Sequence, residues 1–298
     1  MTTDRVSRRL RAAFDDAGAQ GWLHVRELSP SGAEVALDAD TPVALSSVYK
    51  LPLLVAFLRM VDAGEIDPTR RVTVPPAPRT AGSTGLSIMR DPVTMSWRDL
   101  AVQMITVSDN AAADVLLHKV GLERVTTTLR TLGLDATTVT RGSAEEIAGL
   151  MTETGAHSVA DAFEALTDLD HVALPSGYDP LRASASTARD MTTLLAALWT
   201  GQAASAEQTA FAKVLLSQRN GPYRLRAGFP HDAIQLADKT GTLGSLRHDV
   251  GVVEFPDRTA YAMAVFTRSA RPDRLLPGVD AVIGQAARLA VDALRANG

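Results

Sequence analysis

One short stretch constrains this chain more than any other: Ser47 stands three residues before Lys50, at the head of a long apolar run. The run covers residues 51–61 and is apolar on almost every side, which is typical of a buried helix. Residues i and i+3 of a helix share a face. We therefore expect the Ser47 hydroxyl in the first turn of a buried helix, with the Lys50 amine beside it.

This pairing suits nucleophilic catalysis, because a serine hydroxyl is a weak nucleophile until a neighbouring base takes its proton. A lysine can be that base when desolvation keeps it partly neutral. The N–H groups of a helix N-terminus can also stabilise a developing oxyanion. The alternative is structural: Ser47 is a helix cap and Lys50 a surface charge with a buried stem. A lone Ser-x-x-Lys pattern favours that alternative, so the decision rests on the rest of the chain.

Composition narrows the class of protein. The chain has 298 residues, 46% hydrophobic and 21% charged, which is ordinary for a globular protein with a sizeable core. A net charge of −4 argues against a nucleic-acid or anionic-membrane partner. Cysteine is absent, which excludes disulfides, thiolate metal sites and a cysteine nucleophile.

The first residues lack the apolar segment of a signal peptide, and no stretch reaches the ~20 apolar residues of a membrane span. We therefore expect a cytoplasmic protein, or a secreted one if an export signal has been removed. We also expect a monomer that acts on a small molecule.

Hydrophobic periodicity and turn residues predict strands at both ends of the chain and helices between them. Strands from both ends usually meet in one antiparallel sheet, with a cleft beside the helical part. We predict one domain over residues 1–298, with an α/β lobe (1–44 and 205–298) and an all-helical lobe (45–204). The expected helices are 4–17, 47–64, 96–105, 111–117, 121–132, 144–151, 159–166, 186–199, 207–216 and 281–296, and the expected strands 21–28, 34–38, 72–74, 233–236, 249–255 and 259–267.

Two further polar motifs accompany the Ser47 stretch. Ser-Asp-Asn at 108–110 lies between two apolar helices, where it is either a helix-breaking cap or part of a site. Lys-Thr-Gly-Thr at 239–242 follows a predicted strand, where the glycine permits close backbone approach and the lysine suits an anionic group. Each motif alone is weak.

Together, in this order, Ser-x-x-Lys, Ser-Asp-Asn and Lys-Thr-Gly form the signature of class A β-lactamases and penicillin-binding proteins. The chain resembles this family, and most closely its class A branch. Segments 82–86, 96–100, 105–113 and 249–253 also match, so the resemblance covers nearly the whole chain. It implies a two-lobed α/β fold, with an antiparallel sheet flanked by helices and an all-helical lobe, and a reaction without metal or organic cofactor.

The resemblance also implies roles in acyl transfer. Ser47 is the acylated nucleophile, Lys50 takes or relays its proton, and Ser108 passes a proton to the leaving nitrogen. The backbone N–H groups of Ser47 and Thr242 form the oxyanion hole, where one donor is typically worth ~3 kcal/mol.

Substrate binding falls to a second group of residues in this resemblance. Asn110 bonds the substrate amide and helps to hold Lys50, while Lys239 and Thr240, next to Gly241, bind its carboxylate. Arg247 lies where class A enzymes often keep a second carboxylate-binding arginine. The alternative for Arg247 is a solvated charge of a hairpin.

The pattern breaks at deacylation. Class A enzymes clear the acyl-enzyme with a glutamate in a Glu-x-x-Leu-Asn motif, but here its expected position falls on Ser143 or Ala144, and no Leu-Asn follows. Glu145 or Glu146 would substitute after a small register shift; otherwise they are first-turn acids of a surface helix. The segment from Arg141 to Ser184 is longer than usual for the family, and would form a lid or reshape the pocket.

Three outcomes follow. The leading one is β-lactam hydrolysis through an acyl-enzyme on Ser47, with a replacement base. The second is the same machinery acting on another ester or amide, as an esterase, peptidase or acyltransferase. The third is a protein that β-lactams acylate without turnover, which would act as a sensor.

Overall fold

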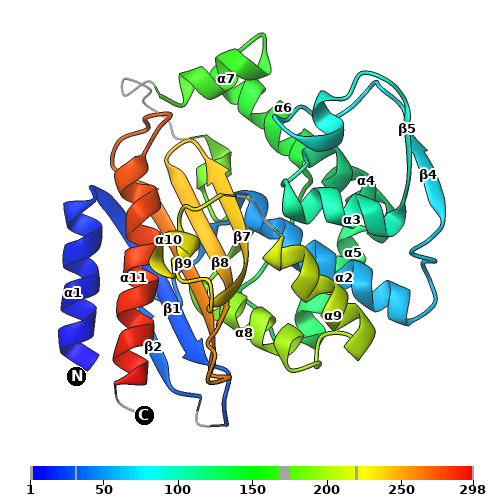
Figure 1. Cartoon of the computed structure of the whole chain (residues 1–298). Helices are drawn as coiled ribbons and strands as arrows, with labels where there is room; N and C mark the ends of the chain where they lie inside the picture. Colours follow the sequence, from blue (N-terminus) through cyan, green and yellow to red (C-terminus); the bar gives the residue numbers. More distant parts are fainter. Residues whose placement is uncertain (1–2, 31, 168–174, 219–220, 297–298) are drawn as a thin grey trace.

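A computed structural model describes residues 3–30, 32–167, 175–218 and 221–296. Its centre is a five-stranded antiparallel sheet in the order β2-β1-β9-β8-β7 (Figure 1). Strands from both ends of the chain share this sheet, which confirms the predicted mixed α/β architecture. Its strands are β1 (Ala19–Glu27), β2 (Glu34–Leu37), β7 (Gln235–Leu243), β8 (Leu246–Glu254) and β9 (Ala260–Ser269).

Two short pairs lie outside the main sheet: β3 (Val43–Ala44) with β6 (Ala185–Ser186), and β4 (Arg71–Val74) with β5 (Val93–Ser96). The α-helices are α1 (Thr3–Asp16), α2 (Lys50–Asp62), α3 (Trp97–Thr106), α4 (Asn110–Val120), α5 (Leu122–Thr131), α6 (Ser143–Thr154), α7 (Val159–Ala165), α8 (Ala188–Trp199), α9 (Ala206–Ser217), α10 (Leu225–Gly228) and α11 (Pro277–Arg295). Short 3-10 turns are η1 (Ser46–Tyr49), η2 (Gly85–Ile88) and η3 (Ser176–Tyr178).

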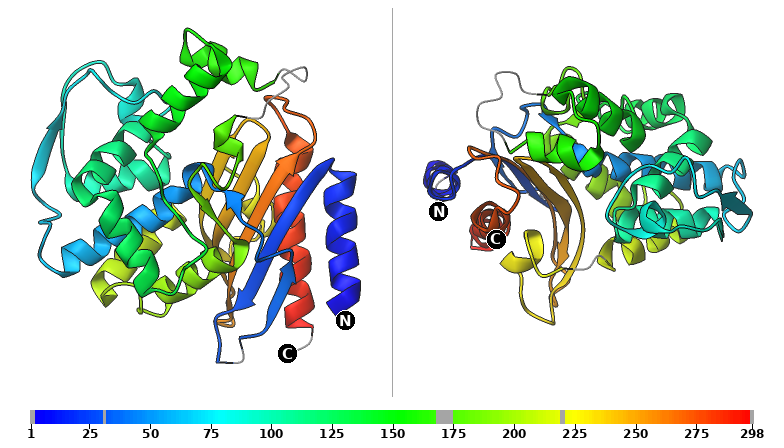
Figure 2. Two further views of the ribbon diagram at one scale, coloured as in Figure 1. Left: turned by 180° about the vertical axis from the view of Figure 1, so that it is seen from behind. Right: turned by 90° about the horizontal axis from the view of Figure 1, so that it is seen from above.

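The sheet separates two layers of helices (Figure 2). Terminal helices α1 and α11 cover one face, where Leu10 and Phe14 pack with Val265 and Ile283 in one apolar core. The remaining long helices lie on the other side, and α8 contacts β1 and β9 there. Both faces of the sheet are thus buried, and its β7 edge is left beside the helical lobe.

Helix α2 runs through the centre of the helical lobe. All but three of its residues are buried, because it is apolar on nearly every side, as its sequence predicts. It packs in the larger core with α3, α4, α8 and α9. The helix that begins at Lys50 is therefore a rigid platform for the residues before it.

The long segment between Arg141 and Ser184 forms its own small structure; residues 168–174 of it lie outside the described residues. Helices α6 and α7 and turn η3 share a small apolar core with the end of β7, including Leu150, Tyr178 and Leu243. The Tyr178 hydroxyl accepts a hydrogen bond from the N–H of Ser245 at 3.0 Å. The segment is thereby fastened to the β7–β8 turn. The division into lobes at residues 44 and 205 stays a prediction.

Candidate active site

Ser47 lies in η1, directly before α2, rather than in the first turn of the α-helix as we expected. The chain enters this turn through Ser46, whose φ of 48° lies in the left-handed region. Such backbone conformations in residues other than glycine are uncommon and concentrate at functional sites. Ser47 is half-buried and lines a cavity between the sheet edge, α4 and α6.

Lys50 is fully buried, which contradicts the alternative of a surface charge. Its Nζ donates to the backbone oxygen of Ser108 at 2.7 Å, to Oδ1 of Asn110 at 2.7 Å and to Oγ of Ser108 at 3.3 Å. Burial lowers the pKa of Lys50 to about 7, against the opposing influence of Asp109 and Asp114. At neutral pH a large fraction of Lys50 is therefore free to accept a proton.

The 108–110 turn has two functions divided among its residues. Asp109 is fully buried and caps α4, accepting from the N–H groups of Ala111 and Ala112, so the cap interpretation holds for this residue. Ser108 and Asn110 turn toward Lys50 instead. Ser108 reaches this position with a φ of 55°.

Lys239 brings the sheet edge to the same point. It is buried, and its Nζ donates to Oγ of Ser108 at 3.0 Å and to the Thr240 carbonyl oxygen at 2.7 Å. Beside it, Gly241 allows β7 to approach η1: an added Cβ would stand 2.6 Å from the Leu45 carbonyl oxygen and 3.0 Å from Val48. The structure thus brings Ser47, Lys50, Ser108, Asn110 and Lys239 together.

Arg247 is the predicted residue that the structure places elsewhere. It is buried, so it is not a solvated hairpin charge, and burial lowers its pKa. Its guanidinium donates to the backbone oxygens of Gly244, Leu246 and Arg274. Those acceptors fix the β8 end, and Arg247 does not line the cavity.

A different arginine, Arg224, contacts the sheet edge at the site. Its guanidinium donates to Oγ1 of Thr242 at 2.7 Å and to the Gly241 carbonyl oxygen at 2.9 Å, and its Nε pairs with Asp280 at 2.7 Å. Thr242 lines the cavity, so Arg224 supplies positive charge next to it. No sequence pattern pointed to Arg224, because it is one of many arginines and reaches Thr242 from a separate loop.

His248 holds the segment before η1 in place. It is fully buried in β8, its Nε2 lies 2.9 Å from the Ala44 carbonyl oxygen, and its Nδ1 accepts the N–H of Thr267. Burial lowers its pKa to about 3. His248 is therefore neutral at physiological pH, donates from Nε2, and holds the segment that leads into η1.

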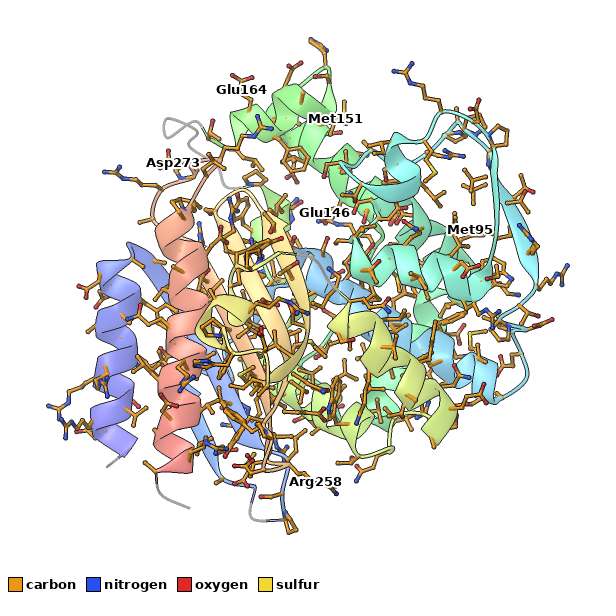
Figure 3. The ribbon with its side chains drawn as sticks, in the orientation of Figure 1. Met95, Glu146, Met151, Glu164, Arg258 and Asp273 are labelled. Carbon is orange, nitrogen blue, oxygen red and sulfur yellow. The ribbon has the colours of Figure 1, made fainter. Side chains whose placement is uncertain are left out.

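The two candidate deacylation bases differ. Glu145 is exposed and does not line the cavity, whereas Glu146 does and lies between the end of the sheet and the helical lobe (Figure 3). Glu146 pairs with Nε of Arg141 at 2.5 Å. Ser143, one of the two positions where the resemblance expects a glutamate, is buried and donates to Oδ1 of Asn110 at 3.3 Å.

In chemical terms the cavity is lined by the Ser47 hydroxyl and by Asn110, whose Oδ1 accepts from the Lys50 amine. The Ser108 hydroxyl accepts from both Lys50 and Lys239 behind that lining. This set suits acyl transfer to Ser47 with an anionic substrate. Among the described residues there is no cluster of three or more residues able to hold a metal ion. Within the same ranges, no helix combines the length and apolar character needed to cross a bilayer.

The sequence is similar to known β-lactamases and to a β-lactamase regulatory protein. The sequence is 35% identical over 99% of both chains to "Beta-lactamase regulatory protein BlaB" of Streptomyces cacaoi. It is 29% identical over 90% of this chain and 82% of the other to the carbapenem-hydrolyzing β-lactamase KPC of Klebsiella oxytoca.

Solved structures agree with these relatives in fold. A β-lactamase from Sphaerobacter thermophilus superposes with a TM-score of 0.79 at 26% identity, covering 99% of both chains. An ancestral class A β-lactamase gives 0.78 at 26% identity, covering 97% of this chain and 99% of the other. The family model Beta-lactamase2, described as "Beta-lactamase enzyme family", matches residues 5–294. The chain belongs to the β-lactamase enzyme family, and its structural neighbours include class A enzymes.

Proposed function

We propose that this chain is a monomeric serine hydrolase of class A β-lactamase type, which β-lactams acylate at Ser47 and which releases the acyl group slowly. The observation that carries the proposal is the buried Lys50, bonded to Ser108 and Asn110 one turn from a serine at the cavity wall. No metal or organic cofactor takes part in the proposed steps.

In the proposed acylation, Ser47 Oγ bonds to the lactam carbonyl carbon while Lys50 takes the hydroxyl proton. The carbonyl oxygen becomes an oxyanion at the backbone N–H groups of Ser47 and Thr242. The C–N bond then breaks, and the leaving nitrogen takes a proton from the Ser108 hydroxyl. Lys50 returns its proton to Ser108, whose Oγ lies 3.3 Å away, so the proton balance closes.

In this proposal the negative charge of the substrate is bound at the edge of β7. Lys239 and Thr240 bind the carboxylate in this proposal, and Arg224 beside Thr242 replaces Arg247 as the second cation. The Nδ2 of Asn110 donates one hydrogen to the Ala81 carbonyl oxygen at 2.9 Å, and in this proposal its second hydrogen bonds the substrate amide oxygen.

Hydrolysis of the acyl-enzyme needs a base for water. Glu146 is the carboxylate that lines the cavity, and its Oε2 is already engaged by Nε of Arg141 rather than open to a water molecule. We therefore propose that deacylation limits turnover.

A second candidate is covalent capture of β-lactams without turnover, as in a sensor. Two observations favour it: Ser143 stands where a deacylating carboxylate is expected, and one relative along the full length is described as a regulatory protein.

Mixing the protein with a chromogenic cephalosporin and following both colour and intact mass tests these proposals. Slow sustained colour with a transient adduct, both lost in Ser47→Ala, supports the hydrolase. One burst with a lasting adduct supports capture. Absence of both colour and adduct contradicts acylation by β-lactams and returns a non-lactam ester or amide as the substrate.

A further inference from the structure

Tyr49, directly before Lys50 in the sequence, is a buried residue whose hydroxyl the proposed mechanism does not use. Its Oη lies 2.9 Å from Oγ of Ser143, a residue that is 94 positions away in the chain. Ser143 is itself buried and lies 3.3 Å from Oδ1 of Asn110. The same Oδ1 accepts from Nζ of Lys50 at 2.7 Å.

The direction of these bonds follows from the chemistry of the groups. The Oδ1 atom of Asn110 can only accept, so the single hydroxyl proton of Ser143 goes to it. Tyr49 must then donate to Ser143. The result is a one-way chain from Tyr49 through Ser143 to Asn110, and it ends on the atom that also holds Lys50.

The Asn110 amide is fixed on its other side as well, because its Nδ2 donates to the Ala81 carbonyl oxygen. Its Oδ1 therefore accepts from two donors, Ser143 and Lys50, and a stronger bond from one weakens the bond from the other. A hydroxyl that receives a hydrogen bond becomes a stronger donor through polarisation. Tyr49 thus strengthens Ser143 in this competition and weakens the hold of Asn110 on the ammonium of Lys50.

The charged groups around Lys50 stay the same in this comparison. Asp109, in the turn before α4, and Asp114, in α4, raise its pKa, and Lys239 of β7 donates to the Ser108 hydroxyl that Lys50 also contacts. Arg141 and Glu146 line the cavity next to Tyr49. A change confined to the Tyr49 hydroxyl leaves all of them in place.

We propose that Tyr49 is a positioning residue that acts through Ser143 and Asn110, and that it keeps Lys50 ready to accept the proton of Ser47. The role of Lys50 in this statement rests on the proposed function; the contacts themselves do not. Loss of the Tyr49 hydroxyl favours the charged form of Lys50, and therefore raises its pKa.

The test begins without substrate. The chain has only four lysines, at positions 50, 119, 213 and 239, so carbon-13 labelling at lysine Cε gives few signals, and Lys50→Met assigns the relevant one. We expect Tyr49→Phe to move the Lys50 titration upward by about half a pH unit and Ser143→Ala to move it at least as far. The double variant should equal Ser143→Ala alone, because Tyr49 acts through Ser143.

Tyr178→Phe is the matched control. It also removes a buried tyrosine hydroxyl near the cavity, but that hydroxyl serves Ser245 and not Asn110. Thermal unfolding confirms that each variant is folded. An unmoved Lys50 titration in folded Tyr49→Phe overturns the proposal, as do an equal shift in Tyr178→Phe and fully additive shifts in the double variant.

The rate of acylation by a β-lactam is then measured for the same variants. With the Lys50 pKa half a unit higher, acylation of Tyr49→Phe at pH 7 should be about twofold slower and should recover at higher pH. If the wild-type chain is not acylated at all, the proposed function fails while the titration still decides the role of Tyr49. If acylation occurs and the titration is unmoved, the proposed function stands and this inference fails.

Discussion

The two walls of the cavity are built differently. On the wall formed by η1, α4 and β7, Lys50 and Lys239 are fully buried and donate to neighbouring oxygens of the protein. On the wall formed by the insertion, Glu146 keeps 27% of its side chain exposed and pairs with Arg141, which keeps 21%. The charged groups of the first wall are buried in a polar network, whereas those of the second form a partly exposed ion pair.

The difference matters because a hydrogen bond or a charge acts more strongly where water is excluded. The groups that we propose to form the acyl-enzyme are held by buried hydrogen bonds, as transition-state stabilisation requires. The carboxylate that we propose to hydrolyse it is partly exposed. We infer that acylation of Ser47 is faster than hydrolysis of the acyl-enzyme. The following predictions test this contrast between the two walls.

The largest effect should come from the buried wall. Lys50→Met keeps the volume of the side chain but removes the proposed base, and should lower the rate of acylation by about 10³-fold. Intact mass over time measures this rate, with Lys119→Met, the same change at an exposed lysine, as the control. A rate within tenfold of the wild type would show that Lys50 is not the base.

The next effect should come from changing the weak wall. Ser143→Glu places a carboxylate beside Asn110, where it can accept a proton from water, and should shorten the life of the adduct about 10²-fold. Ala144→Glu adds the same charge one residue away on an exposed position. Equal shortening in both variants, or in neither, would contradict the assignment of this position.

The dependence on pH should be about tenfold. The neutral form of Lys50 is the active one, and with a pKa of about 7 its fraction rises from roughly 9% at pH 6 to roughly 91% at pH 8. Acylation should therefore accelerate through this range and level off above it. Rapid-mixing rates in buffers of matched ionic strength measure the profile. A flat profile between pH 6 and 8 would point to a different base.

The sequence predicted the buried wall better than the insertion wall, for a physical reason. Ser47 and Lys50 are placed by local helical geometry, and Gly241 by the need for close approach, so their patterns can be read along the chain. The expected strand 233–236 was too short, because β7 continues through the polar residues 239–242 at the sheet edge.

Contacts between distant segments left no such pattern. The position of Arg247 before a strand left two interpretations open, a carboxylate-binding residue or a solvated hairpin charge, and in the structure its guanidinium bonds backbone oxygens instead. Arg224 reaches Thr242 from another loop. The pairing of Tyr49 with Ser143 depends on how the insertion folds back over η1. These positions follow from tertiary packing, which the periodicity of a single segment does not encode.

The smallest effect should come from the carboxylates of the insertion. Glu146→Gln removes the cavity carboxylate and should lengthen the life of the adduct severalfold, because a paired and partly exposed base contributes modestly. Glu145→Gln, on the exposed neighbour outside the cavity, should leave it unchanged. Measuring adduct decay after removal of excess β-lactam compares the two. Identical decay in both variants and the wild type would exclude both glutamates as bases.

The hydrogen atom that serves Gly241 as a side chain has a mechanical consequence. Without a side chain at Gly241, β7 packs directly against the Leu45 carbonyl oxygen and Val48. The strand and the turn therefore cannot move independently. The η1 turn with Ser47 and the β7 edge with Lys239 therefore form one rigid unit. Any widening of the cavity for a bulky ligand has to come from the opposite side, where α6, α7 and η3 meet the hairpin through a small apolar core and the Tyr178 hydroxyl.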